Sequence, residues 1–155
     1  MIYPKKLKEN DIIEIISPSN GVKIKKIKKY EKAIENLNSY GFNIIEDKYV
    51  RNSEHGVSSS AFNRSFEFNK AVKETDVKAL VACSGGDYLI QIMDLINFNC
   101  IKNNIKWIQG QSDITPLLFY ITTKFDIATI YSFNVKSFGD DYLPKSMIKN
   151  NIDFL

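Results

Sequence analysis

Short apolar segments alternate along the chain with longer segments whose apolar residues recur every three or four positions. The short segments are typical of strands, and the almost wholly apolar run at 77–83 fits a parallel strand covered on both faces. The longer segments are typical of amphipathic helices, the first of which ends before Gly41. The pattern predicts strands at 11–16, 42–46, 77–83, 105–109 and 127–131, and helices at 22–39, 60–73, 88–95, 113–124 and 146–155.

This order of elements indicates an α/β fold with an open, mainly parallel sheet and helices on both faces, as in flavodoxin-like domains. With 155 residues and 44% hydrophobic content, the chain is long enough to form one domain with a real core. No segment approaches the roughly 18–20 apolar residues that span a bilayer, and the N-terminal residues lack the apolar region of a signal peptide. We therefore expect a cytoplasmic protein that does not insert into membranes.

Charge and cysteine content narrow the possible functions further. The net charge of +3 is too small to indicate nucleic-acid binding. Six lysines gather at 23–32, where they form either a solvated helix face or an anion-binding surface. Cys83 and Cys100 lack the spacing of a metal site and are interpreted as buried thiols. We expect neither a metal nor another cofactor.

Three loops follow predicted strands, at 17–21, 84–87 and 110–113. The carboxyl ends of parallel strands meet at one edge of a sheet, where open α/β sheets form their binding sites. This convergence predicts a site there, with Ser17, Gly85 and Asp87 as substrate-binding residues, although Asp87 also suits a helix cap or turn.

Ser112 lies on the bend between the fourth strand and the next helix, and Gly110 permits a sharp turn before it. A serine in this position can present its hydroxyl as a nucleophile above the sheet edge. It can equally cap the following helix, because serine is a favoured N-cap residue. The segment is not a complete G-x-S-x-G pattern, since Thr115 occupies the place of the second glycine.

Gly85 and Gly86 follow the apolar third strand. Their backbone N–H groups could bind a ligand oxygen, as in an oxyanion hole or a phosphate-binding loop, or the pair could simply form a tight turn. No complete nucleotide-binding glycine motif is present, so a flavodoxin-like nucleotide binder lacks its usual support. The single histidine, His55, falls in a polar loop and is not an obvious base for Ser112.

Taken together, these segments resemble the LD-carboxypeptidase family of serine peptidases, which includes muramoyl-tetrapeptide carboxypeptidase and the microcin C7 immunity protein. Each motif alone is weak, whereas the ordered set is specific. The matching segments are Pro4 with 6–11, 17–19, 64–69, 77–79, 84–89, 96–98, 110–115 and 128–131.

The resemblance implies that Ser112 is the nucleophile and that the backbone N–H groups of Asp113 and Gly86 form the oxyanion hole. It also implies cleavage, without metal, of the bond between an L-centre and a terminal D-residue in murein-type peptides, or of a related amide bond. Gln111 occupies the position before the serine, where family members commonly have an aromatic residue. This difference affects the expected pocket shape more than the chemistry.

Family members carry a second, C-terminal domain that supplies the glutamate and histidine of a Ser-Glu-His triad. Residues 1–145 are expected to form the N-terminal domain, and 146–155 the start of a linker or helix toward that second domain. His55 does not match the family histidine, so we expect the isolated chain to be inactive or nearly so.

Several alternatives remain open. The alternatives for the chain are a truncated piece, one half of a split gene and a degraded copy, and either a homodimer or a separately encoded C-terminal half would complete it. It could also be a non-catalytic ligand-binding or assembly module of the same fold. An exposed apolar patch near Phe133, Phe138 and Tyr142 is expected where a second domain would pack.

Overall fold

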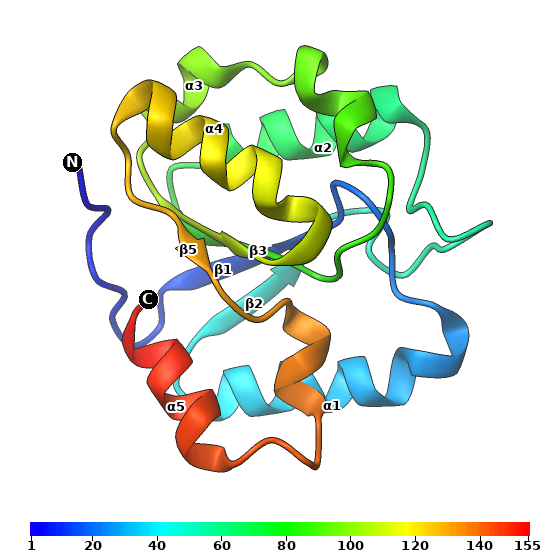
Figure 1. The fold of residues 1–155 in the computed structure, drawn as a ribbon. Helices are drawn as coiled ribbons and strands as arrows, with labels where there is room; N and C mark the ends of the chain where they lie inside the picture. Colours follow the sequence, from blue (N-terminus) through cyan, green and yellow to red (C-terminus); the bar gives the residue numbers. More distant parts are fainter.

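The five strands form one sheet in the order β2-β1-β3-β4-β5, and every pairing is parallel (Figure 1). The computed structural model describes all residues, 1–155. The strands are β1 (Ile12–Ile16), β2 (Asn43–Glu46), β3 (Val77–Ala82), β4 (Trp107–Gly110) and β5 (Ile130–Tyr131). The predicted α/β fold with a flavodoxin-like parallel sheet is confirmed.

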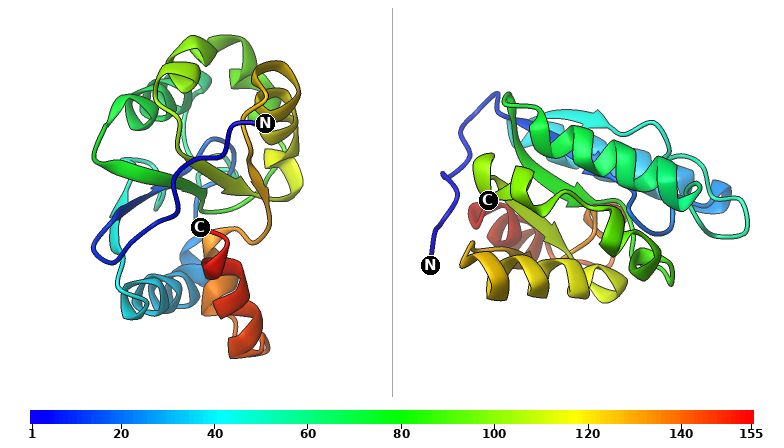
Figure 2. Two further views of the ribbon diagram at one scale, coloured as in Figure 1. Left: turned by 90° about the vertical axis from the view of Figure 1, so that its left-hand side faces the viewer. Right: turned by 90° about the horizontal axis from the view of Figure 1, so that it is seen from above.

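Two helical layers cover the sheet, one on each face (Figures 1 and 2). One layer contains α2 (Ala61–Lys73), the 3-10 helix η2 (Leu89–Leu95), α3 (Phe98–Asn103) and α4 (Thr115–Phe125). The other contains α1 (Ile27–Ser39), the 3-10 helix η4 (Val135–Gly139) and α5 (Lys145–Asp153). Each layer buries its own apolar cluster against the sheet, which explains why the central strands are apolar on both faces.

The carboxyl ends of the strands determine where a ligand can bind. The strand order reverses direction between β1 and β3, whose carboxyl ends lie side by side in the register Ile16↔Ala82. In open α/β sheets the crevice at such a reversal is the usual binding position. The loops that follow β1, β3 and β4 therefore share one edge of the sheet.

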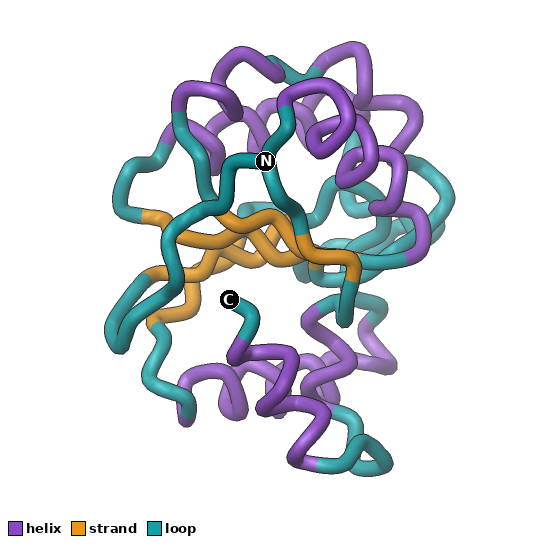
Figure 3. The backbone as a smooth tube through the Cα atoms, turned by 60° about the vertical axis from the view of Figure 1, so that its left-hand side comes forward, coloured by secondary structure: helices purple, strands orange, loops and turns teal.

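Two predicted elements differ from the structure. The segment predicted as a helix at 88–95 forms the 3-10 helix η2. The fifth strand contains only two residues, because Ile127 pairs instead with Ile2 of the N-terminal segment, which crosses this end of the sheet (Figure 3). The Ile2 N–H donates to the carbonyl of Asp126 at 2.6 Å, and the Ala128 N–H donates to the Ile2 carbonyl at 2.8 Å.

The C-terminal residues pack on the domain as helix α5. Ile148, Ile152 and Leu155 belong to the apolar cluster beneath the sheet, and the Leu7 N–H donates to the Leu155 carbonyl at 2.8 Å. The role expected for 146–155, as a lead into a further domain, stays a prediction.

The apolar patch expected at Phe133, Phe138 and Tyr142 is only partly present. Phe138 is buried in the core beside α1, with Phe133 packed edge-on against it at 6.0 Å between ring centroids. Only Tyr142 is fully exposed. Exposed apolar side chains gather instead near the β5 edge, around a cavity of about 660 Å³ that Tyr131, Met147 and Phe154 help to line. No helix combines the length and the apolar content needed to cross a membrane.

Candidate functional site

Ser112 occupies a strained bend directly after β4. Its φ is +61°, in the left-handed region that non-glycine residues rarely adopt, and its side chain is exposed. The first residues after the bend form a short 3-10 helix, η3 (Ser112–Ile114), which continues into α4. Gly110 allows this close turn, because a Cβ there would lie 2.8 Å from Cγ2 of Ile114.

The alternative of Ser112 as a helix cap is wrong. Gln111 is the N-cap residue of η3 and Ile114 is that of α4, and neither helix start receives a side-chain cap. Capping would require the Ser112 hydroxyl to accept a backbone N–H of the following turn. The hydroxyl is therefore available for another partner.

The glycine turn after β3 lies directly against Ser112. A Cβ on Gly85 would be 3.0 Å from Cβ and 3.2 Å from Oγ of Ser112, so only glycine allows this approach without displacing the serine. A Cβ on Gly86 would collide with the side chains of Ser19 and Asn20. The Gly86 N–H takes part in no hydrogen bond within the chain. The loops after β1, β3 and β4 are thus brought together as predicted.

The carboxylate of Asp113 holds these loops in place. Its Oδ2 accepts hydrogen bonds from Ser19 Oγ at 2.5 Å, from the Tyr88 N–H at 3.0 Å and from the Leu89 N–H at 2.9 Å. The residue after the serine therefore connects all three loops through its side chain, while its backbone N–H lies in the first turn of a helix, where such groups lack intrahelical acceptors.

A second connection comes from the buried guanidinium of Arg64 on α2. Its nitrogens donate to the carbonyls of Pro18 at 2.7 Å, Tyr88 at 2.9 Å and Ser59 at 2.9 Å. A fourth hydrogen bond reaches Gln91 Oε1 at 2.6 Å. Burial lowers the pKa of this guanidinium, while the charge of Asp113 opposes that shift. From α2, Arg64 therefore helps to hold the loops after β1 and β3 in place.

Ser17 does not present a free group to a substrate. It is buried, and its hydroxyl donates to the carboxylate of Asp47 at 2.8 Å, with the Ser17 N–H bound to the same carboxylate. Burial raises the pKa of Asp47, although the hydrogen bonds from Ser17 and from the Tyr49 N–H oppose the shift. Ser17 thus supports the loop after β1, and its expected substrate-binding role stays a prediction.

Asp87 and His55 are both exposed. Asp87 makes no side-chain hydrogen bond or salt bridge, so it remains available at the rim of the glycine turn. His55 has a φ of +51° and lines a separate hollow of about 360 Å³, together with Tyr88 and Gln91. It makes no hydrogen bond to Ser112, as expected of a loop histidine, and no other side chain binds the serine hydroxyl as a base would.

Sequence reasoning missed two residues near the site, both on the segment after β5. Asn134 is buried, and its Oδ1 accepts the Gln111 N–H at 3.0 Å, which fixes the residue before the serine. Lys136 donates from Nζ to Ser84 Oγ at 3.0 Å, next to the glycine turn, and burial lowers its pKa. The only signal in the sequence was their position after a predicted strand, where site loops occur.

Comparison with known proteins identifies the family. The model of the LD-carboxypeptidase N-terminal domain matches residues 13–132. A predicted carboxypeptidase of Vibrio cholerae is 28% identical over 141 residues, which are 90% of this chain and 42% of that protein. The microcin C7 self-immunity protein MccF of Escherichia coli is 28% identical over 131 residues, covering 84% of this chain and 38% of the relative.

The solved structure of an MccF-like protein from Bacillus anthracis superposes with a TM-score of 0.92 at 27% identity. It covers 100% of this chain, which in turn spans 47% of that structure. The chain therefore spans less than half the length of the relatives it matches. The matched region contains the strands and all three loops of the site, and the chain belongs to the LD-carboxypeptidase family, whose N-terminal domain it contains.

Proposed function

We propose that this chain provides the nucleophile and the oxyanion-binding groups of a serine carboxypeptidase that cleaves L,D-peptide bonds of murein-type peptides. The observation that carries the proposal is the strained backbone of Ser112, whose hydroxyl caps no helix and whose side chain lies against Gly85. Strain of this kind is retained at sites where function requires the geometry.

The proposed chemistry begins with attack of Ser112 Oγ on the carbonyl carbon before the terminal D-residue. The carbonyl oxygen then becomes an oxyanion, which the N–H groups of Asp113 and Gly86 would stabilise. Two features support these donors: the Gly86 N–H has no partner within the chain, and that of Asp113 belongs to a helix start. Gly85 is buried against Ser112, and the exposed Asp87 borders the surface where the substrate would lie.

A base is needed to remove the proton from Ser112, and no side chain of this chain is bonded to its hydroxyl. An unactivated serine is a weak nucleophile, and removing triad members decreases the rate by several orders of magnitude. The isolated chain is therefore proposed to bind substrate without appreciable turnover, with the glutamate and histidine of the triad contributed by a C-terminal domain.

A boronic-acid analogue of a peptide ending in D-alanine tests the nucleophile separately from turnover, because it forms a tetrahedral adduct with a serine hydroxyl. We expect calorimetry to show binding at least about tenfold weaker in S112A, the loss of roughly 1.4 kcal/mol or more. The exposed Ser39 offers a matched control, and S39A should bind as the unmodified chain does. Equal binding to the unmodified chain and to S112A would contradict the assignment of the nucleophile.

Release of D-alanine from a murein tetrapeptide tests the proposed inactivity. We expect none above background, with or without a chelator. Metal-independent release that S112A abolishes would overturn the proposed inactivity while supporting Ser112 as the nucleophile.

The second candidate is a non-catalytic binding module, which the absence of a base near Ser112 favours. It predicts saturable binding of unmodified tetrapeptide that survives S112A, together with equal boronate binding in both proteins.

A further inference from the structure

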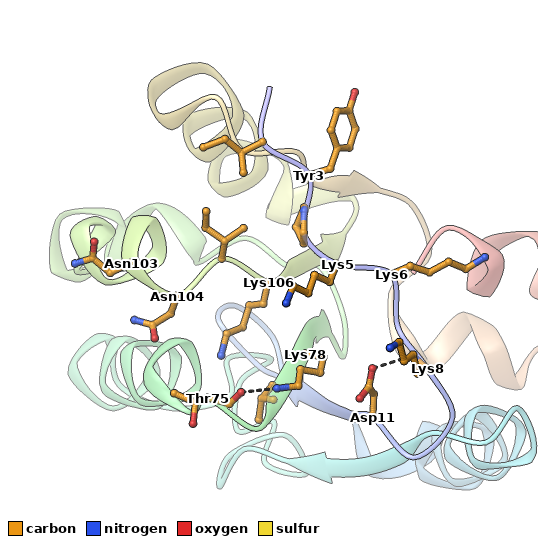
Figure 4. A pocket seen from close by; sticks show the side chains of 14 residues that line it. Tyr3, Lys5, Lys6, Lys8, Asp11, Thr75, Lys78, Asn103, Asn104 and Lys106 are labelled. Atoms are coloured by element: carbon orange, nitrogen blue, oxygen red, sulfur yellow. Dashed lines mark hydrogen bonds between the residues drawn. The ribbon is translucent and has the colours of Figure 1, made fainter.

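A lysine-rich cavity lies at the amino ends of the strands, whereas Ser112 lies at their carboxyl ends. It has a volume of about 580 Å³, within the range of small-molecule sites. Its walls are the N-terminal segment and the residues at the amino ends of β1, β3 and β4 (Figure 4). The charged residues that line it are Lys5, Lys6, Lys8, Lys78, Lys106 and Asp11.

The positive charge of this cavity is only partly offset within the chain, where the carboxylates of Glu14 and Glu74 act on Lys106. Five lysines and one aspartate line the cavity, and none of the five lysines takes part in a salt bridge. The carboxylate of Asp11 accepts the backbone N–H of Lys8 at 2.8 Å. The basic cluster on α1 differs, because Lys29 and Lys32 are paired with Asp140 and Asp141. The chain carries only +3 overall, whereas five lysines against one aspartate make the lining of this cavity strongly positive.

Three of the amino groups come from opposite walls and face the same hollow. Figure 4 shows Lys5 from the N-terminal segment directed toward Lys78 and Lys106, whereas Lys6 points away. The Lys78 Nζ donates to the Thr75 carbonyl at 2.7 Å, and the Lys106 Nζ donates to the carbonyls of Ala71 at 3.1 Å and Glu74 at 2.6 Å. These bonds fix both amines without supplying a negative charge.

The wall that carries Lys5 is held in place before any ligand binds. The Trp107 Nε1–H donates to the Lys5 carbonyl at 3.1 Å, and the pairing of Ile2 with Ile127 anchors the start of the same segment. Burial lowers the pKa of Lys106 to about 8, so a neighbouring anion would favour its charged form. Preorganised donors reduce the ordering that binding requires.

We propose that this cavity is a second binding site, for a small anion that carries two or more linked phosphate groups. Lysine ammonium groups bind phosphate as point charges, and amines on facing walls suit an anion whose charge is spread over two phosphates. Tyr3 also lines this cavity. A nucleoside diphosphate and free pyrophosphate both carry the two linked phosphates that the site requires. The site is independent of Ser112 and of the proposed peptidase activity.

Calorimetric titration of the chain with inorganic pyrophosphate tests this proposal. We expect saturable binding with a dissociation constant on the order of 0.1–1 mM, weakened by added salt. The double variant K5Q/K78Q should bind about tenfold more weakly, as the loss of two charge contacts predicts. S112A should bind like the unmodified chain.

The matched control is K25Q/K28Q, which removes two exposed lysines from the other side of the molecule and should change the affinity less than about threefold. No saturation at 10 mM pyrophosphate, roughly tenfold above the weakest expected constant, would overturn the proposal, as would equal weakening by the two double variants. Citrate binding as tightly as pyrophosphate would overturn the phosphate assignment. Adenosine diphosphate distinguishes a nucleotide site from a site for free pyrophosphate. If it binds more tightly than pyrophosphate and Y3A removes this difference, the ligand is a nucleotide. If the two ligands bind equally, the site recognises the phosphates alone.

Discussion

Ser112 combines an unfavourable backbone conformation with a side chain that makes no structural hydrogen bond. The left-handed conformation destabilises an L-residue by roughly 1–2 kcal/mol. Neither helix capping nor core packing explains a serine in this position, which leaves the hydroxyl itself as the explanation. The next residue, Asp113, stabilises the bend through hydrogen bonds to the loops after β1 and β3.

Replacing Ser112 by glycine should therefore relieve strain that replacement by alanine retains. We expect S112G to be more stable than S112A by about 0.5–1 kcal/mol, after allowing for the larger conformational entropy of glycine in the unfolded chain. Urea unfolding of both variants measures the difference. If S112G is the less stable of the two, the backbone at this position is not strained.

At the scale of elements, Arg64 makes four hydrogen bonds, two of which connect α2 to the loops after β1 and β3 through the carbonyls of Pro18 and Tyr88. Lysine cannot reproduce the planar, forked geometry of a guanidinium. We expect R64K to decrease the free energy of unfolding by about 2–4 kcal/mol, because it leaves buried carbonyls unpaired and an ammonium poorly solvated.

The exposed Arg51 provides the control for this experiment, since R51K replaces the same chemical group in a solvated position and should change stability by less than about 1 kcal/mol. Chemical denaturation of both variants gives the comparison. Similar small losses in R64K and R51K would show that the loops do not depend on the buried guanidinium.

The fold was largely predictable from the sequence because strands covered on both faces are almost wholly apolar, as is β3 apart from Lys78. The bend at Ser112 and the turn at Gly85 were also predictable, since both follow strands and contain glycine nearby. The burial of Arg64 was not predictable, because its acceptors at Pro18 and Tyr88 come from segments distant in sequence. From the sequence, Ile127 was wrongly placed in the fifth strand, because its pairing partner, Ile2, lies at the other end of the chain.

At the scale of the whole molecule, a buried carboxylate in the sheet governs how stability should depend on pH. Glu14 on β1 is 5% exposed, and its Oε2 has no hydrogen-bond partner. Burial, reinforced by the charge of Asp47, raises the pKa of Glu14 from 4.5 to about 7, although Lys70 and Lys106 oppose this shift. Between these two values the folded chain binds more protons than the unfolded chain.

Stability should consequently fall as the pH rises from about 4.5 to 7 and then level off, with Glu14 contributing a loss of at most about 3 kcal/mol. In E14Q this part of the pH dependence should be greatly reduced. Urea unfolding at several pH values between 5 and 8 measures both slopes. A wild-type stability that increases over this interval, or an unchanged slope in E14Q, would contradict the prediction.

The hydrogen bonds of Asp113 to the Tyr88 and Leu89 N–H groups have a further consequence, for the exchange of those amides with solvent deuterium. The Leu89 N–H donates to this carboxylate, and the Tyr88 N–H donates both to it and to Ser19 Oγ, so each amide can exchange only when its acceptors withdraw. Their protection factors therefore report on the bend that carries Ser112, although neither residue is part of it. Deuterium uptake at these two positions would reveal when the bend opens, in a chain that need not turn over any substrate.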